Sequence, residues 1–226
     1  MPDGVSWKEK LLSAIFPSRC AMCGRITMGG KRVCARCQEE SPPQARFRKL
    51  EAGSSGMEVF CVAPYSYKGQ VRRAILQFKF RGKREKAAGL AEALVLALPP
   101  RWQTADAVCW VPLSAKRLEE RGYDQSELLA RKVAKAIGRP CRKLLIKVQE
   151  NQVQHSLRRE ERIKNVQGVY RADSTSIQGK RILVIDDIVT TGSTLGECAG
   201  ELYRAGATEI HCAAAASAEG DWDYES

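Results

Sequence analysis

The chain has 226 residues, enough to bury a substantial core in one or two domains. Its composition is that of an ordinary globular protein, and no apolar run approaches the roughly 18 residues of a membrane span, which excludes a membrane-embedded class. The net charge of +11 is uneven, because residues 181–226 contain two basic and nine acidic residues and the other 180 contain 35 and 17. This imbalance favours a polyanionic partner, although many basic side chains are only solvated.

The N-terminal segment resembles no secretory signal, because its apolar piece, Leu11 to Phe16, is short and no cleavage site follows. We therefore expect a cytoplasmic protein. Apolar residues at helical spacing predict a short amphipathic helix over Trp7–Phe16, which Pro17 ends. In that compartment the nine cysteines of the chain indicate metal binding more than disulfides.

Two Cys-x-x-Cys pairs follow, Cys20 with Cys23 and Cys34 with Cys37. The two-residue gap lets both sulfurs of a pair face one ion, and Gly29-Gly30 allows the chain to turn and bring the pairs together. Four thiolates form a closed tetrahedral site, so we predict a structural Zn²⁺ ribbon without a catalytic role. An iron–sulfur centre or a redox dithiol is the alternative.

Composition also predicts the domain boundaries. Residues 1–45 form an N-terminal helix and zinc-ribbon module, and the proline, serine and glycine content of Ser41–Gly56 predicts a linker over 46–58. Residues 59–218 form the main domain, starting with a strand or hairpin arm at Val59–Tyr67, and 219–226 form an acidic tail.

The stretch from Lys68 to Lys86 is the most basic in the chain. Val71, Ile75 and Phe78 recur at helical spacing, and aromatic residues alternate with cations over 78–83, as in proteins that bind single-stranded nucleic acid. The alternative is a solvated helix face with buried aromatics. The candidate nucleic-acid contacts are Arg72, Arg73, Lys79 and Arg81.

The next segments alternate between helix and strand. A helix is expected over Arg84–Leu98, a first core strand over Ala105–Pro112, and a cationic loop after it that carries Lys116, Arg117 and Arg121. A second helix, capped at Asp124, reaches Ile137.

A second strand is expected over Lys143–Val148 and a brief one at Val169–Tyr170. Between them, Gln149–Asn165 is polar and rich in charge, and a loop of this length predicts a mobile flap.

The most informative stretch is Arg181–Thr194. An apolar run, Ile182–Ile185, ends in Asp186 and Asp187, and a turn of hydroxyl residues and one glycine leads into a helix over Leu195–Ala205. Loop and first-turn N–H groups lack intrahelical partners and lie at the positive end of the helix dipole, so they bind a phosphate. Two adjacent acids indicate that sugar hydroxyls or a divalent metal are held as well. A last strand follows over Glu209–Ala216.

The segment Val184–Thr194 resembles the phosphoribosyl pyrophosphate (PRPP) motif of type I phosphoribosyltransferases: an apolar strand, two acids and a Thr/Gly loop. A receiver domain also places paired acids after a strand. There the pair comes early in the domain, whereas here only one helix and one strand remain, so we reject that alternative.

The whole chain resembles the ComF family, bacterial proteins associated with DNA uptake and natural transformation. The resemblance rests on segments that occur in family order from Phe16 to Ser217. These are the two Cys-x-x-Cys pairs, Lys79–Gly82, Val111–Leu113, Lys116-Arg117, Arg121–Ser126, Gln154–Leu157, Glu161-Arg162 with Asn165, and the PRPP motif. One departure is Asp124, where the family usually has Asn.

The resemblance implies a fold and a set of roles. The fold is α/β, a type I phosphoribosyltransferase domain with a parallel sheet flanked by helices, behind a small four-Cys zinc ribbon. Asp186 and Asp187 would be the catalytic acids and would hold the ribose hydroxyls. The 5′-phosphate would bind Thr190, Thr191, Gly192, Ser193 and Thr194. Lys116 and Arg117 would meet the pyrophosphate, with Mg²⁺ bridging its oxygens, and the 149–165 flap would close over the reaction centre.

Two functions of different class follow from this resemblance. In the first, the protein is a phosphoribosyltransferase that displaces pyrophosphate from PRPP with an acceptor that the sequence does not identify. In the second, PRPP or a nucleotide is a regulatory ligand, and the basic surface and zinc module bind single-stranded DNA during uptake. The expected partners are therefore PRPP, single-stranded DNA and the DNA-uptake machinery.

Overall fold

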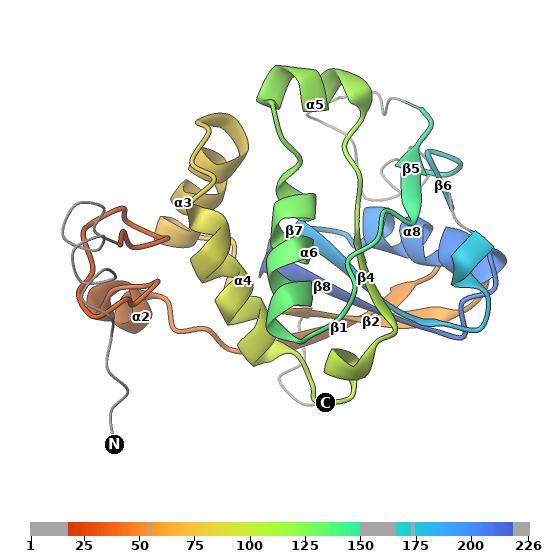
Figure 1. Ribbon diagram of the computed structural model, residues 1–226, viewed down its shortest axis with the longest axis horizontal. Coiled ribbons are helices and arrows are strands. Elements are labelled where there is room, and N and C mark those ends of the chain that lie inside the picture. The colour runs from red at the N-terminus through yellow and green to blue at the C-terminus, as the bar shows by residue number, and fades with distance from the viewer. Residues whose placement is uncertain (1–17, 54, 150–165, 173–174, 219–226) are drawn as a thin grey trace.

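The computed structural model describes residues 18–53, 55–149, 166–172 and 175–218 (Figure 1). Its main sheet has the strand order β1-β2-β8-β7-β4, with β3 also paired to β8, and all neighbours are parallel except β1 and β2. The strands are β1 (Arg46–Glu51), β2 (Glu58–Ala63), β3 (Tyr65–Ser66), β4 (Ala107–Trp110), β7 (Arg181–Val189) and β8 (Glu209–Ser217). The predicted parallel sheet is thus confirmed.

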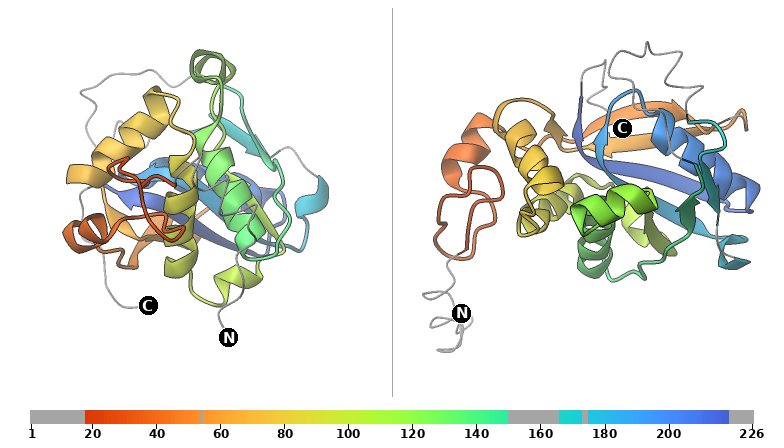
Figure 2. Two further views of the ribbon diagram at one scale, coloured as in Figure 1. Left: turned by 60° about the vertical axis from the view of Figure 1, so that its left-hand side comes forward. Right: turned by 90° about the horizontal axis from the view of Figure 1, so that it is seen from above.

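Helices cover both faces of this sheet (Figures 1 and 2). Helices α4 (Lys86–Ala97) and α6 (Gln125–Ala136) pack on one face, and α8 (Ser193–Arg204) packs on the other. Strand β7 supplies both cores, because Leu183 and Ile185 point to the first face and Ile182 and Val184 to the second. This double burial explains why the strand reads as a continuous apolar run.

The segment that we predicted as a second strand is placed outside the main sheet. Strand β5 (Leu145–Lys147) pairs antiparallel with β6 (Tyr170–Ala172) in a separate two-stranded sheet. The predicted strand at Val169–Tyr170 is therefore confirmed as β6, whereas a position for Lys143–Val148 among the core strands was wrong. Short strands with a half-exposed face do not reveal their partner in the sequence.

The predicted linker over 46–58 contains a strand, which corrects that part of the sequence interpretation. Arg46–Glu51 forms β1 and pairs with Glu58–Ala63 in full register, from Arg46 with Ala63 to Glu51 with Glu58. The two runs flank a turn that contains Gly53 and Gly56, both with positive φ. This is a hairpin signal that the high content of polar and charged residues obscured.

Helix α8 contacts β1 through small residues. Gly192, Gly196 and Gly200 recur every four residues, and a Cβ added at them would meet Leu50, the Glu51 carbonyl and the Ala52 carbonyl respectively. Because residues four apart share one helix face, the absence of three side chains lets this face touch the end of β1 directly.

The cysteine-rich module lies at one end of the molecule, beside α3 (Gly69–Phe80) and α4 (Figure 2). It contains an antiparallel bridge, Arg19 with Ile26, and the short helix α2 (Ala35–Glu40). The ammonium of Lys86, a buried residue on α4, donates to the Ala21 and Met22 carbonyls at 2.8 and 3.2 Å. The predicted Trp7–Phe16 helix lies outside the described residues.

Helix α3 is amphipathic as predicted: Val71, Ile75 and Phe78 are buried, whereas Arg72 and Arg73 are exposed. The predicted helices after it are also confirmed, as α4 and as α6, whose N-cap Asp124 accepts from the Ser126 and Glu127 amides. No helix in the described ranges is long and apolar enough to cross a membrane.

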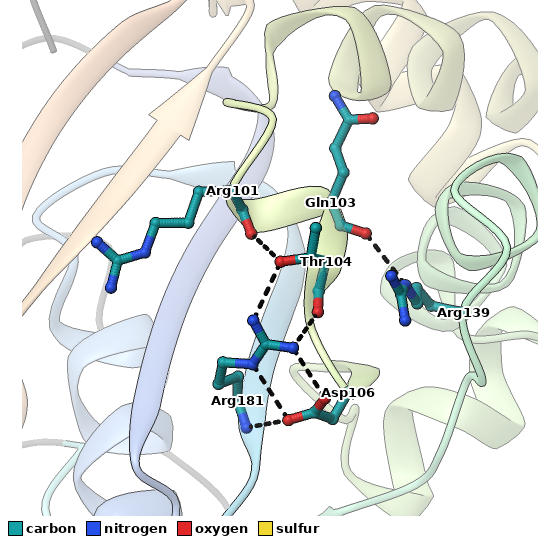
Figure 3. Close-up of polar contacts among 6 residues, drawn as sticks. All are labelled: Arg101, Gln103, Thr104, Asp106, Arg139 and Arg181. Carbon is teal, nitrogen blue, oxygen red and sulfur yellow. Dashed lines mark hydrogen bonds and ion pairs between the residues drawn. The ribbon is translucent and has the colours of Figure 1, made fainter.

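A polar network ties together the ends of β4 and β7 where the two strands begin (Figure 3). The Arg181 guanidinium donates to both carboxylate oxygens of Asp106 and to the carbonyl of Thr104, which closes the short 3-10 helix Trp102–Thr104. These hydrogen bonds lower the pKa of Asp106. The network lies at the opposite end of the strands from Asp186. It therefore stabilises the pairing of β4 with β7 and is not part of the acid-pair site.

Candidate functional site

The two acids lie near the carboxyl end of β7, which pairs in parallel with β8 on one side and with β4 on the other. Strand β7 does not end at them, as the sequence suggested, but continues to Val189. Asp186 lies opposite Ala214 of β8 and Ile188 opposite Ala216, so the acids are held by sheet pairing rather than by a loop. The carboxyl ends of parallel strands are where ligands bind in open α/β folds.

Each acid has a side-chain partner from a different helix. Asp187 is buried, and its Oδ1 forms an ion pair with Lys79 Nζ at 2.8 Å, from the end of α3. Asp186 Oδ1 accepts from Ser126 Oγ at 2.9 Å, at the start of α6, and from the Asp187 amide at 2.8 Å. The structure therefore joins Lys79, predicted as a nucleic-acid contact, to the acid pair.

The electrostatics distinguish Asp186 within the pair. Burial raises the pKa of Asp186 to about 7, and the Asp187 carboxylate raises it too, while Lys79 and the two hydrogen bonds act in the opposite direction. A carboxyl group with such a pKa is partly ionised near neutral pH. The arrival of a ligand or a cation can therefore change its charge. Perturbation of this kind is frequent at functional sites.

The predicted phosphate loop runs from Thr190 into α8. Gly192 adopts φ +85°, a left-handed conformation that favours glycine, and Ser193 is the first residue of the helix. Thr191 Oγ1 and Ser193 Oγ lie 2.8 Å apart, so the two hydroxyls are gathered at the helix start. Hydroxyls at the N-terminus of a twelve-residue helix, where first-turn amides lack intrahelical partners, suit a phosphate.

A pocket of about 180 Å³ adjoins this loop on the side of β1. Arg48, Thr191, Gly192 and Ser193 are among its lining residues, and Arg48 Nη1 donates to the Thr190 carbonyl at 2.9 Å. Arg48 was not among the predicted site residues, because its stretch was predicted to be a linker. The hairpin signal around Gly53 and Gly56 is what could have placed a strand, and its cations, beside the loop.

The expected cationic loop after β4 is mostly a helix, which corrects the sequence interpretation. Ala115–Arg121 forms α5, capped by Ser114 Oγ and ended by Gly122 at φ +70°. Lys116 is exposed and Arg117 half-buried in its first half, and the structure places no hydrogen bond or ion pair between either of them and the acid pair. A single capping serine after Pro112 was enough to start the helix early.

Arg121, at the other end of α5, is the cation of this segment that the acid pair affects. Burial lowers its pKa and the Asp187 carboxylate raises it. Its guanidinium donates to Gln125 Oε1 at 2.7 Å and lies over the Phe80 ring, 4.8 Å from the ring centroid. Arg121, Lys79 and Asp187 therefore belong to one charged cluster between α3, α5 and β7.

The remaining nucleic-acid candidates lie on the outer surface of α3 and just beyond it. Arg72, Arg73 and Arg81 are exposed, and Arg72 lies over the Tyr67 ring at 5.9 Å from the centroid. The predicted 149–165 flap falls almost entirely outside the described residues, so it stays a prediction.

The four predicted zinc ligands come together. The Sγ atoms of Cys20, Cys23, Cys34 and Cys37 all lie within 4.8 Å of one another, and those of Cys23 and Cys34 are 3.8 Å apart. Tetrahedral Zn–S bonds of about 2.3 Å place sulfurs roughly 3.8 Å apart, so the donor set fits Zn²⁺. The ion would hold the two cysteine pairs together as a structural site. Neither Asp186 nor Asp187 belongs to this cluster.

Comparisons with known proteins agree with both parts. The phosphoribosyl transferase domain family matches residues 124–224, and the double zinc ribbon domain family matches residues 11–47. The DNA utilization protein YhgH of Salmonella typhimurium is 30% identical over 201 residues, which cover 85% of this chain and 81% of that protein. The chain belongs to the ComF/YhgH family. The competence protein ComFC of Bacillus subtilis is 28% identical over 177 residues, 78% of this chain and 68% of that one.

Within this ComF/YhgH protein the predicted architecture is confirmed: a type I phosphoribosyltransferase fold with an N-terminal four-cysteine ribbon. Among solved structures, one that matches part of this chain is the glutamine PRPP amidotransferase of B. subtilis, at 24% identity and a TM-score of 0.42. The match covers 62% of this chain and only 30% of that enzyme.

Proposed function

We propose that the protein binds PRPP, with Mg²⁺, at the Asp186–Thr194 loop and acts in DNA uptake. The observation that carries the ligand is the joint placement of the acid pair and the helix-start hydroxyls along one strand–loop–helix segment. The names of the relatives, which refer to DNA utilization and competence, support the biological role.

The carboxylates suit sugar hydroxyls better than direct metal ligation. Lys79 already neutralises Asp187 at 2.8 Å, so a cation bound to that oxygen would have to displace the ammonium. Asp186 and Asp187 would accept from the ribose 2′- and 3′-hydroxyls, and Thr190–Thr194 would hold the 5′-phosphate. Mg²⁺ would be carried by the pyrophosphate, whose negative charge it would reduce.

If PRPP is turned over, the reaction is substitution at the ribose C1. The C1–O bond to pyrophosphate breaks as a nucleophile of the acceptor bonds to C1, through a cationic sugar-like transition state. Arg121 and Lys79, both beside the acid pair, would counter the charge of the departing pyrophosphate. Lys116 and Arg117 would approach it from the first half of α5.

Thermal unfolding tests the ligand assignment. A ligand at 100 times its dissociation constant stabilises the folded state by about 2.7 kcal/mol, so PRPP with Mg²⁺ should raise the melting temperature of the wild type. Asp187→Ala should lose this increase, and Glu119→Ala, an exposed acid on α5, should keep it. Equal behaviour of Asp187→Ala and the wild type would refute the assignment. Pyrophosphate release across candidate acceptors then separates turnover from binding alone.

A second candidate function is single-stranded DNA binding with PRPP or a nucleotide as regulatory ligand. The exposed cations Arg72, Arg73 and Arg81 at one end of the molecule favour it. Affinity for a single-stranded oligonucleotide should fall as salt rises. It should fall further when all three residues are changed to Ala. A matched variant with Lys132, Lys135 and Lys143 changed to Ala removes the same charge elsewhere, and an equal loss in both would show that no particular patch is used.

A further inference from the structure

Phe80 is exposed at a point where the proposed function gives it no role. Helix α3 buries Phe78 completely, yet 62% of Phe80, the last residue of the helix, is exposed to solvent. The two aromatic residues of this segment therefore have different environments. Phe78 belongs to the core, whereas Phe80 is free to contact something outside it.

The ring of Phe80 lies at the rim of the acid-pair site. Its neighbour Lys79 forms the ion pair with Asp187, and the Arg121 guanidinium lies over the Phe80 ring, 4.8 Å from the ring centroid. Helices α3 and α5 thus approach each other at this contact (Figure 1). Burial lowers the pKa of Arg121, and the Asp187 carboxylate acts against this effect. One part of the ring faces Arg121, and the exposed remainder offers an apolar surface.

Several contacts hold this arrangement in place without a ligand. Tyr123, which follows α5, donates its hydroxyl to the Phe78 carbonyl, and Arg84 donates to the Gly122 carbonyl at 2.8 Å. Arg84 also lies over the Tyr123 ring, 4.6 Å from its centroid. The end of α3 and the turn that follows it are therefore each joined to the residues that follow α5, so the Phe80–Arg121 pair is preorganised. Preorganised aromatic groups lose little entropy on binding.

We propose that Phe80 and Arg121 form a stacking platform for an unpaired nucleobase beside the acid pair. A planar nitrogen heterocycle stacks on an exposed aromatic ring without regard to its hydrogen-bonding edge, and a guanidinium plane supports such stacking. The proposal rests on the proposed function, since it places the base next to the ribose that the acids would hold. The same chemistry belongs to a free nucleobase, as acceptor, and to one base of a single strand.

Fluorescence of 2-aminopurine, which changes on stacking, tests the platform in two arms. One arm titrates free 2-aminopurine with the full-length zinc-loaded protein, and the other titrates a single-stranded oligonucleotide that carries one 2-aminopurine. Base–aromatic stacking contributes about 1–3 kcal/mol per base, so Phe80→Ala should weaken binding about 5- to 150-fold in the arm that uses the platform. Phe80→Trp should restore it, because a larger aromatic ring keeps the stacking surface.

The matched control is Phe60→Ala. Phe60 is also exposed, at 48%, but lies on β2 opposite His211, near the start of β8 and away from the carboxyl end of β7. This variant should bind as the wild type does. A loss in the free-base arm identifies a free acceptor base, and a loss confined to the oligonucleotide identifies a base within a strand.

Two results would overturn the platform: unchanged affinity of Phe80→Ala in both arms, or no binding of either probe by the wild type. Thermal protection by PRPP is measured in parallel, and Phe80→Ala should retain it. If the wild type shows no protection by PRPP but base binding depends on Phe80, the proposed function fails and the platform stands.

Discussion

Asp186 accepts two hydrogen bonds, from Ser126 and from the Asp187 amide, and its pKa is still raised to about 7. The folded state therefore binds a proton more tightly than the unfolded chain, in which an aspartate titrates near 3.9. Between about pH 4 and pH 7 the folded state holds more protons, so the contribution of this residue to stability falls as pH rises through that window. An ionised Asp186 is kept at a cost in stability, which is expected of a binding group.

Asp186→Asn should therefore stabilise the free protein at pH 8, by about 1–3 kcal/mol, because the desolvated charge is removed and the amide oxygen still accepts from Ser126. The gain should vanish toward pH 4. The same variant should bind PRPP more weakly. Urea unfolding at several pH values measures the first effect and ligand-induced thermal shifts the second; a variant that is destabilised equally at every pH would contradict the electrostatic argument.

At this scale the sequence identified the acids and the hydroxyl loop but not their partners. Asp186, Asp187 and Thr190–Thr194 are adjacent in the chain, so their order alone carried the prediction. Lys79 and Arg48 reach the site from α3 and β1, more than 100 residues earlier, and a contact over that separation depends on packing that local pattern does not record.

At the scale of elements, two helical glycines allow close packing between parts of the molecule: Gly196 between α8 and β1, and Gly89 between α4 and the cysteine-rich module. A Cβ at Gly196 of α8 would lie 2.2 Å from the Glu51 carbonyl oxygen, and a Cβ at Gly89 of α4 would lie 2.5 Å from the Cβ of Ala21 in the cysteine-rich module. Alanine favours helices over glycine by about 1 kcal/mol, so both Gly→Ala changes would be stabilising in an unpacked helix.

In this fold both should destabilise, by about 1–3 kcal/mol, because the added methyl group meets a neighbour that cannot withdraw. Gly196→Ala should also weaken PRPP binding, since it displaces α8 from β1, whereas Gly89→Ala should spare the ligand and loosen the module. Chemical unfolding together with PRPP titration separates the two. Equal effects on ligand affinity would show that the two contacts are not independent.

Periodicity predicted the long elements well. The helices α3, α4, α6 and α8 and the strands β7 and β8 have apolar patterns that match their burial. It failed at β1 and α5, which are short and polar, and at the pairing of β5. In those segments a turn glycine or one capping serine decides the structure, and such signals are weak beside a high content of charged residues.

At the scale of the whole molecule, the cysteine-rich module has little core of its own and depends on α4 and on metal. Zinc analysis should find about one ion per chain, and Cys34→Ser should reduce it and lower the melting temperature, because a structural zinc site contributes directly to folding. The control is Cys61→Ser, a buried cysteine outside the cluster, which should keep the zinc whatever its effect on stability. Absence of metal from the wild type would refute the zinc site.

Strand β1 has a further consequence that concerns solubility rather than binding. It is an edge strand, with β2 as its one partner among the described residues, and an edge strand is a template for pairing with another molecule. Its sequence, Arg-Phe-Arg-Lys-Leu-Glu, places charges at four of six positions and so discourages such pairing. Arg48, which faces the phosphate loop, is one of them. Neutral substitutions introduced here to study the ligand therefore also remove a safeguard against aggregation.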